Sequence, residues 1–145
     1  MDRDLRDPRA AVIADNTIEI ADESDLIVVR ETLRDISQTG QLGLVAQTKF
    51  ITAGSEIARN ILKFATEGRG CLVTEQILLG GRHGPRATFY DQGPGIADID
   101  TAMIDGFSTS GSLGLGLPGA KRLVDEMEIH SDESGTCVVL TMWSR

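Results

Sequence analysis

A carboxylate and a carboxamide, Glu56 and Asn60, stand four residues apart in a segment with a helical pattern. Side chains at this spacing lie one turn apart on the same edge of a helix. Asn60 would give Mg²⁺ a hard oxygen ligand beside phosphate and water oxygens. Glu56 would be a general base that takes a proton from whatever attacks a γ-phosphate, an effect worth about 10²–10⁴ in rate. The alternative is a helix edge that faces solvent and has no site.

A second polar motif, Asp91-Gln92-Gly93-Pro94-Gly95, follows a predicted strand. A carboxylate held at the end of a strand can accept a hydrogen bond from an exocyclic amine such as that of adenine. Gly93 and Gly95 carry no Cβ, so a ligand could approach the backbone closely. The alternative is an ordinary turn, because Asp, Gly and Pro all favour turns.

A third motif, from Gly114 to Gly119, matches the pattern GxGxxG. The dinucleotide fingerprint of this form needs a strand directly before it in a βαβ unit, whereas loop-forming residues 107–112 precede it here. We interpret it as a flexible lid that leads into a helix N-terminus, where backbone N–H groups and the helix dipole suit phosphate. The sequence has no GxxxxGK[ST] pattern, which excludes a P-loop.

The elements that would position these motifs follow from hydrophobic periodicity and from Gly and Pro breaks. Strands are predicted over 17–21, 71–79, 86–90, 127–131 and 136–143, and helices over 26–38, 44–66, 98–104 and 118–126. Residues 80–85 would form a hairpin loop and 105–113 a mobile loop. In the longest helix an apolar stripe would face the core, with Glu56 and Asn60 on its border: Phe50, Ala53, Ile57, Ile61 and Phe64. The order predicts an α+β sandwich, with helices on one face of a mixed or antiparallel sheet.

Composition limits the class of protein. The 145 residues suit one domain over 16–145, preceded by a loose charged arm over 1–15. The net charge of −8 argues against a nucleic-acid partner, because binding a phosphate backbone needs clustered Lys and Arg. Cys71 and Cys137 lie in apolar runs, which predicts buried reduced thiols. Without a secretory leader or an apolar run of roughly 18 residues, we expect a cytoplasmic protein with no membrane partner.

Taken in order, the motifs resemble those of the GHKL superfamily of ATPases and kinases. The segment from Glu56 to Asn60 resembles its N-box, and that from Asp91 to Gly95 its DxGxG box. The glycines from Gly114 to Gly119 resemble its second glycine box, and Gly135-Thr136 its late Gly-Thr pair. The resemblance implies a Bergerat-type two-layer α/β sandwich, with helices on one face of a mixed, mostly antiparallel sheet.

The resemblance also implies a role for each motif. Asp91 would bind the adenine amine with support from Thr136, Asn60 would hold Mg²⁺, and Glu56 would be the base for a serine or threonine hydroxyl. The other implied nucleotide-binding residues are those of the two glycine motifs: Gly93, Gly95, Ile96, Gly114, Leu115, Gly116 and Gly119. The implied cofactors are ATP and Mg²⁺.

The segments over 55–61, 105–111 and 117–123 narrow the resemblance to the RsbT-type serine/threonine kinases, which are related to anti-sigma factor kinases. That family phosphorylates STAS-domain proteins of the stressosome. The released kinase then activates a metal-dependent serine phosphatase. Histidine kinases of the superfamily usually carry Asn where this chain has Glu56, and they need a histidine-bearing dimerisation domain.

Three alternatives remain open at this point. The superfamily's ATPases also carry Glu at this position, where it activates water, but they need further domains for which we expect 145 residues to leave no room. The chain could instead be an anti-sigma factor kinase that binds a sigma factor directly. It could also be an ATP-binding docking module without catalytic output.

Overall fold

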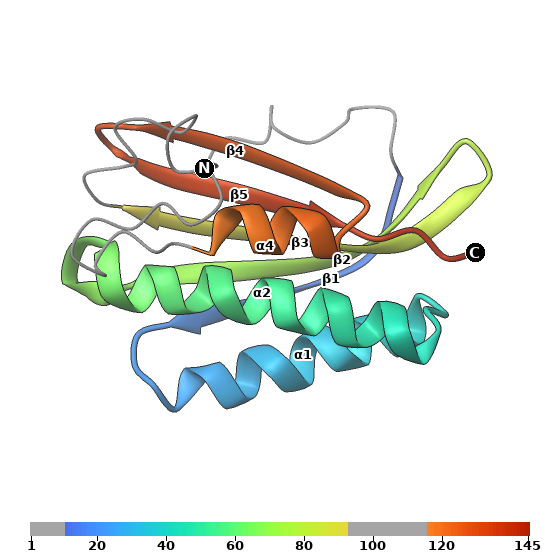
Figure 1. Ribbon diagram of the computed structural model, residues 1–145, viewed down its shortest axis with the longest axis horizontal. Helices are drawn as coiled ribbons and strands as arrows, with labels where there is room; N and C mark the ends of the chain where they lie inside the picture. Colours follow the sequence, from blue (N-terminus) through green and yellow to red (C-terminus); the bar gives the residue numbers. More distant parts are fainter. Residues whose placement is uncertain (1–10, 93–115) are drawn as a thin grey trace.

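The computed structural model describes residues 11–92 and 116–145, which form one antiparallel sheet with helices on one face (Figure 1). The strand order is β1-β2-β3-β5-β4. The elements in chain order are β1 (Ala11–Ile20), α1 (Asp25–Thr39), α2 (Leu44–Phe64), the 3₁₀ turn η1 (Thr66–Gly68), β2 (Gly70–Leu79), β3 (Arg82–Gln92), α4 (Leu117–Leu123), β4 (Glu126–Asp132) and β5 (Gly135–Thr141). Every strand pair in the described residues is antiparallel. The α+β sandwich expected from the sequence is confirmed.

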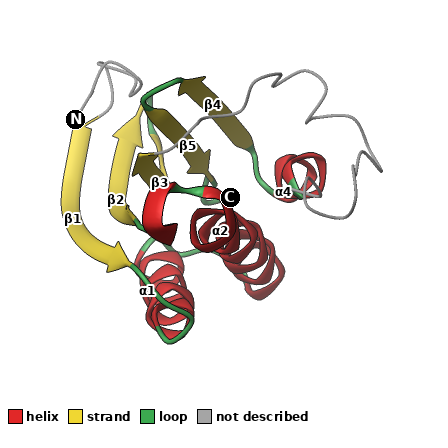
Figure 2. Ribbon diagram, turned by 90° about the vertical axis from the view of Figure 1, so that its left-hand side faces the viewer, coloured by secondary structure: helices red, strands yellow, loops and turns green. Residues whose placement is uncertain are grey.

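The helices form the second layer of the sandwich. Figure 2 shows α1, α2 and α4 on the same side of the sheet. The α2 helix packs between α1 and α4. The stripe predicted on α2 is buried at Phe50, Ala53, Ile57 and Ile61, and Phe64 is partly buried at its end. These side chains share one core with apolar residues of the central strands, among them Leu72, Phe89, Val138 and Leu140. Burial of this stripe fixes which edge of α2 carries Glu56 and Asn60.

The close approach of α1 to α2 depends on a glycine. A Cβ at Gly54 would overlap the Cδ1 atom of Leu33, which is completely buried on α1. One residue further along α2, the Ser55 hydroxyl donates to the Ile51 carbonyl at 2.7 Å and accepts from the Arg30 Nε at 3.4 Å. The two helices are therefore held in one register directly beside Glu56.

The first strand is longer than the sequence pattern predicted. It begins at Ala11 rather than at residue 17, so residues 11–15 belong to the sheet and not to the loose arm expected over 1–15. The pairing of Ala11 with Leu78 extends β1 along the whole of β2. The backbone groups of β2 need hydrogen-bond partners along its full length. Periodicity missed this extension because residues 11–16 do not alternate between apolar and polar. Residues 1–10 lie outside the described part of the chain.

The hairpin predicted at residues 80–85 is confirmed, but its turn contains only Gly80 and Gly81. Both have positive φ, +58° and +80°, as two-residue hairpin turns of the most favoured type require. The strand β3 therefore starts at Arg82 and includes Gly84, where a Cβ would overlap the Met142 carbonyl. Pro85 has no N–H to donate, but its carbonyl accepts from Met142 N at 3.2 Å.

Other boundaries moved by a few residues. The helix expected over 118–126 ends at Leu123, because β4 starts at Glu126. The last strand is shorter than the expected 136–143 and spans Gly135–Thr141. The helix predicted over 98–104 and the mobile loop over 105–113 lie outside the described residues.

Cys137 is buried and Cys71 partly buried, and neither forms a disulfide. No helix in the described residues is both long enough and apolar enough to cross a membrane.

Candidate active site

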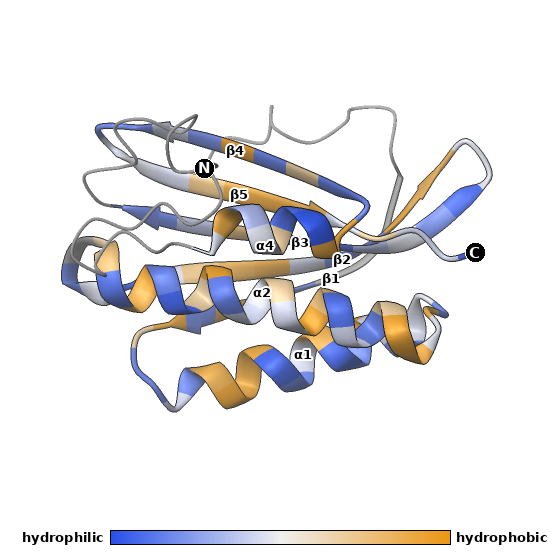
Figure 3. Cartoon of the chain, in the orientation of Figure 1, coloured by the Kyte–Doolittle hydropathy of each residue, from blue (hydrophilic) through white to orange (hydrophobic). Residues whose placement is uncertain are grey.

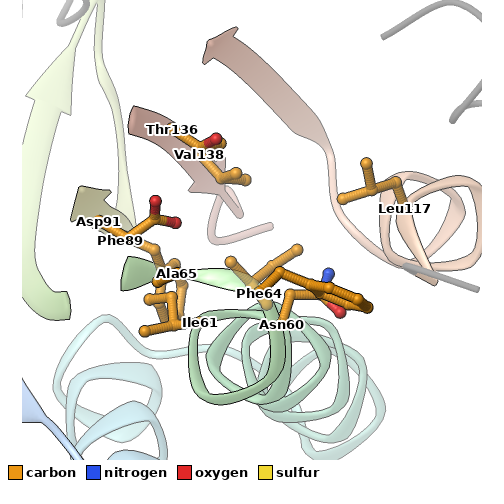
Figure 4. A pocket seen from close by; sticks show the side chains of 10 residues that line it. Asn60, Ile61, Phe64, Ala65, Phe89, Asp91, Leu117, Thr136 and Val138 are labelled. Atoms are coloured by element: carbon orange, nitrogen blue, oxygen red, sulfur yellow. The ribbon is translucent and has the colours of Figure 1, made fainter. Parts of the chain in front are cut away.

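Three of the predicted site residues meet at one cavity between the sheet and α2. The cavity is lined by residues of α2, β3, β5 and α4, together with Ala65 just after α2: Ile57, Asn60, Ile61, Phe64, Ala65, Phe89, Asp91, Leu117, Thr136 and Val138. Figure 4 shows Asp91 and Thr136 on the sheet side of this cavity and Asn60 on the helix side. The other lining residues are apolar. A cavity with apolar walls and a few convergent polar groups suits a small ligand with a flat aromatic part.

Asp91 is the acidic group of the cavity. It pairs with Thr136 in the antiparallel register of β3 and β5. Burial raises the pKa of the Asp91 carboxyl above its ordinary value, and a hydrogen bond from the Thr136 backbone opposes this shift only in part. A half-buried carboxylate of this kind can accept a hydrogen bond from an amine in the cavity.

The neighbouring Gly-Thr pair is built into the edge of the cavity. Gly135 has a φ of +153°, and a Cβ there would overlap the Asp91 carbonyl. The glycine therefore lets β5 start directly beside the end of β3. The Thr136 hydroxyl is hydrogen-bonded to the Ser131 hydroxyl of β4 at 2.9 Å, which orients it at the cavity wall.

Glu56 lies one helical turn before Asn60 but does not itself line the cavity. Its Oε1 accepts from Arg59 Nη1 at 3.0 Å, and both side chains are about 40% exposed. An ion pair this exposed adds little stability, but it limits the positions of the carboxylate. Glu56 is therefore partly accessible to solvent in the described part of the chain.

Gly116, in the third motif, lies next to the side chain of Glu56. Its φ of +66° is a left-handed conformation that favours glycine, and a Cβ there would lie 2.7 Å from Glu56 Oε2. The next residue, Leu117, is buried at the cavity. The N-box and the end of the second glycine motif are thus neighbours in space, although 60 positions separate their residue numbers.

The remaining predicted residues divide into two groups. Gly119 lies in α4, does not line the cavity, and has open space where a Cβ would be. The others fall outside the described residues: Gly93, Gly95, Ile96, Gly114 and Leu115. Sequence reasoning missed the apolar walls, above all Phe89, Leu117 and Val138. Their only signal was adjacency to a motif, because periodicity does not distinguish a cavity wall from the core.

The donors present fit a magnesium ion that is bound mainly through a nucleotide. The described residues contain no cluster of three His, Cys, Asp or Glu side chains that could hold a metal. The amide oxygen of Asn60 could supply one ligand, with phosphate and water oxygens completing the shell, which is the usual arrangement for Mg²⁺.

Comparison with known proteins agrees with this geometry. Residues 46–145 match the family described as histidine kinase-, DNA gyrase B-, and HSP90-like ATPase. The chain is also similar to the serine/threonine-protein kinase RsbT of Bacillus subtilis (strain 168). The two are 43% identical over 129 residues, which cover 88% of this chain and 96% of the relative.

The chain therefore belongs to the GHKL family of ATP-binding proteins, as its motifs suggested. Its fold is of the Bergerat type. Within this family it is an ATP-dependent serine/threonine-protein kinase of the RsbT type.

Proposed function

We propose that this kinase transfers the γ-phosphate of ATP to a serine or threonine of a STAS-domain protein in a stress-signalling, partner-switching module. Once released from that protein, the kinase activates a metal-dependent serine phosphatase. The observation that carries the transfer step is the arrangement of Asn60, Asp91 and Thr136 at one cavity, with Glu56 one turn outside it. An occupied cavity would leave the base exposed to a protein substrate.

The cavity would bind the adenine end of ATP at its sheet side. The Asp91 carboxylate accepts a hydrogen bond from the adenine amine, supported by the Thr136 hydroxyl. Phe64, Phe89 and the other apolar side chains exclude water from the base. Mg²⁺, when bound through Asn60 and the phosphates, neutralises charge on the transferring group.

Glu56 would act on the protein substrate rather than on ATP. Its carboxylate accepts the proton of the serine or threonine hydroxyl while that oxygen bonds to the γ-phosphorus and the bond to the ADP oxygen breaks. Most of the acceleration comes from holding the two reactants in line, since phosphoryl transfer gives the protein little covalent chemistry to do. Arg59 keeps the Glu56 carboxylate beside Gly116.

The direct test is a phosphotransfer assay. The purified protein is mixed with Mg-ATP labelled in the γ-phosphate and with a STAS-domain protein from the same cells. We expect label on a serine or threonine of the STAS protein. If the label is released only as inorganic phosphate, the protein is an ATPase toward water and the proposal is wrong.

Two alternatives to this function make different predictions. An anti-sigma factor kinase would retain a sigma factor in a pull-down, which we do not expect here. A docking module would activate the phosphatase without transferring phosphate to any protein. Phosphatase activation by a Glu56→Ala protein would show that docking is separate from transfer, which is compatible with a kinase that does both.

A further inference from the structure

Lysines stand at equal distances on both sides of Glu56 along the solvent side of α2. Lys49 precedes Glu56 by seven residues and Lys63 follows it by seven. Seven residues are two helical turns, so each lysine lies about 10.5 Å along the axis and only about 20° around it from Glu56. Both lysines are exposed. The proposed base is therefore at the middle of a row with a cation at each end.

The neighbouring helix adds to this charge. Lys121 and Arg122 are exposed in the last turn of α4, where Figure 3 shows a strongly hydrophilic stretch. The α4 helix packs against α2, and its first residue follows Gly116 at the Glu56 carboxylate. The two helices together contain five basic residues and one acidic residue, whereas the whole chain has a net charge of −8. Basic residues thus outnumber acidic ones on α2 and α4, the two helices that meet at Glu56.

Binding of ATP phosphates does not account for the position of Lys49. Lys49 lies eleven positions before Asn60, which corresponds to about 16 Å along the helix axis, in the direction away from the cavity. None of Lys49, Lys121 and Arg122 lines the cavity. The distance between Lys49 and Asn60 also exceeds the electrostatic screening length of about 8 Å at physiological ionic strength. Lys49 is therefore placed to meet something larger than a nucleotide.

We propose that the surface formed by Lys49, Lys63, Lys121 and Arg122, here called the α2–α4 basic surface, docks an acidic segment of the protein substrate beside the phosphoacceptor residue. This inference rests on the proposed function, since it names how the protein substrate of the same site is recognised. Charge of one sign around a site raises the rate of encounter with a partner of opposite sign and sets its orientation. The acidic remainder of the kinase would repel that segment elsewhere.

The test measures transfer at varied concentrations of a STAS-domain protein and saturating Mg-ATP. The variants are Lys49→Glu and Lys121→Glu, with Arg34→Glu as the matched control. Arg34 is exposed on α1 and gives the same change in net charge. We expect each α2–α4 variant to raise the KM for the protein substrate by about tenfold or more, within the range that electrostatic steering covers. The kcat, the Kd for ATP and the thermal midpoint should match those of wild type, and Arg34→Glu should have a KM close to wild type.

Each other result has a definite meaning. If wild type transfers phosphate and the α2–α4 variants keep the wild-type KM, the docking inference is wrong and the kinase function stands. The inference also fails if Arg34→Glu raises the KM as much as they do, or if they weaken ATP binding instead. If wild type transfers no phosphate to any STAS protein, the proposed function fails first and the inference falls with it.

Discussion

The charged form of Asp91 lowers the stability of the folded protein but is the form proposed to bind the ligand. Its carboxyl is half-buried, and burial raises its pKa above the ordinary value for aspartate, so the charged form is disfavoured in the folded protein. A group with a raised folded pKa contributes stability below its unfolded pKa, and this stability is lost as the pH rises through the folded pKa. At neutral pH the charged carboxylate is therefore maintained at a cost, which binding the adenine amine would offset.

We expect Asp91→Asn to weaken ATP binding and to stabilise the protein without ATP. In the variant the one amide oxygen accepts from the Thr136 backbone, which leaves an NH₂ donor facing the adenine amine. Losing a hydrogen bond to a charged group in this way costs about 1.5–3 kcal/mol, which corresponds to a roughly ten- to 150-fold higher Kd. The same reasoning predicts that the affinity of wild type for ATP falls as the pH is lowered through the raised pKa of Asp91. Calorimetric titration with ATP and denaturant unfolding of both proteins would measure these effects. Unchanged ATP affinity in the variant would exclude Asp91 from the adenine site.

At the scale of elements, the position of Glu56 and Asn60 depends on how closely α1 approaches α2. Gly54 and Leu33 are the point of contact, and Leu33 is fully buried. Any side chain at Gly54 would push the helices apart or force Leu33 out of its rotamer.

We expect Gly54→Ala to destabilise the fold, although alanine favours helices. The gain in helix propensity is about 1 kcal/mol and overpacking costs about 1–3 kcal/mol, so a net loss of up to about 2 kcal/mol should appear in denaturant unfolding. A double-mutant cycle with Leu33→Ala tests the cause. The cost of Gly54→Ala should shrink in the Leu33→Ala background, and an equal cost in both backgrounds would show that the two residues are not coupled.

The sequence predicted the long elements better than their ends. The apolar stripe on α2 was predicted correctly because an amphipathic helix repeats its burial pattern, here over about four turns. The start of β1 was missed because residues 11–16 do not alternate between apolar and polar, and their pairing partner β2 is distant in sequence. The start of β3 was missed because Gly84 and Pro85 favour loops locally, whereas the contacts with Met142 and Ser144 that hold them in a strand are distant in sequence.

For the whole molecule, the sequence predicted that three polar residues meet at one cavity, but it did not predict the apolar walls of that cavity. Asn60, Asp91 and Thr136 belong to recognisable motifs, and their order alone suggested a shared pocket. Phe89, Leu117 and Val138 could not be separated from the core, because burial produces the same residue types in a cavity wall. The contact of Gly116 with Glu56 depends on the packing of α4 against α2, which no local pattern encodes.

Binding of Mg-ATP should stabilise the whole domain, because the cavity joins α2 to β3, β5 and α4. A ligand at about 100 times its Kd adds roughly 2.7 kcal/mol to the free energy of unfolding. For a protein of this size, this predicts a rise in the thermal midpoint of about 5–10 °C. Thermal unfolding with and without Mg-ATP would measure it. At the same ATP concentration Asp91→Asn should show less than half of the shift, and an equal shift would place the nucleotide elsewhere.

The central claim is that Glu56 removes the proton from a protein hydroxyl during phosphoryl transfer. The most direct measurement is the single-turnover rate of phosphate transfer to a STAS-domain protein by wild type and by Glu56→Gln, with both proteins saturated with Mg-ATP. Glu56→Gln keeps the shape of the side chain and removes the base. We predict that the Kd for ATP stays the same and that the transfer rate falls by about 10²–10⁴. A transfer rate close to wild type in Glu56→Gln would contradict the account.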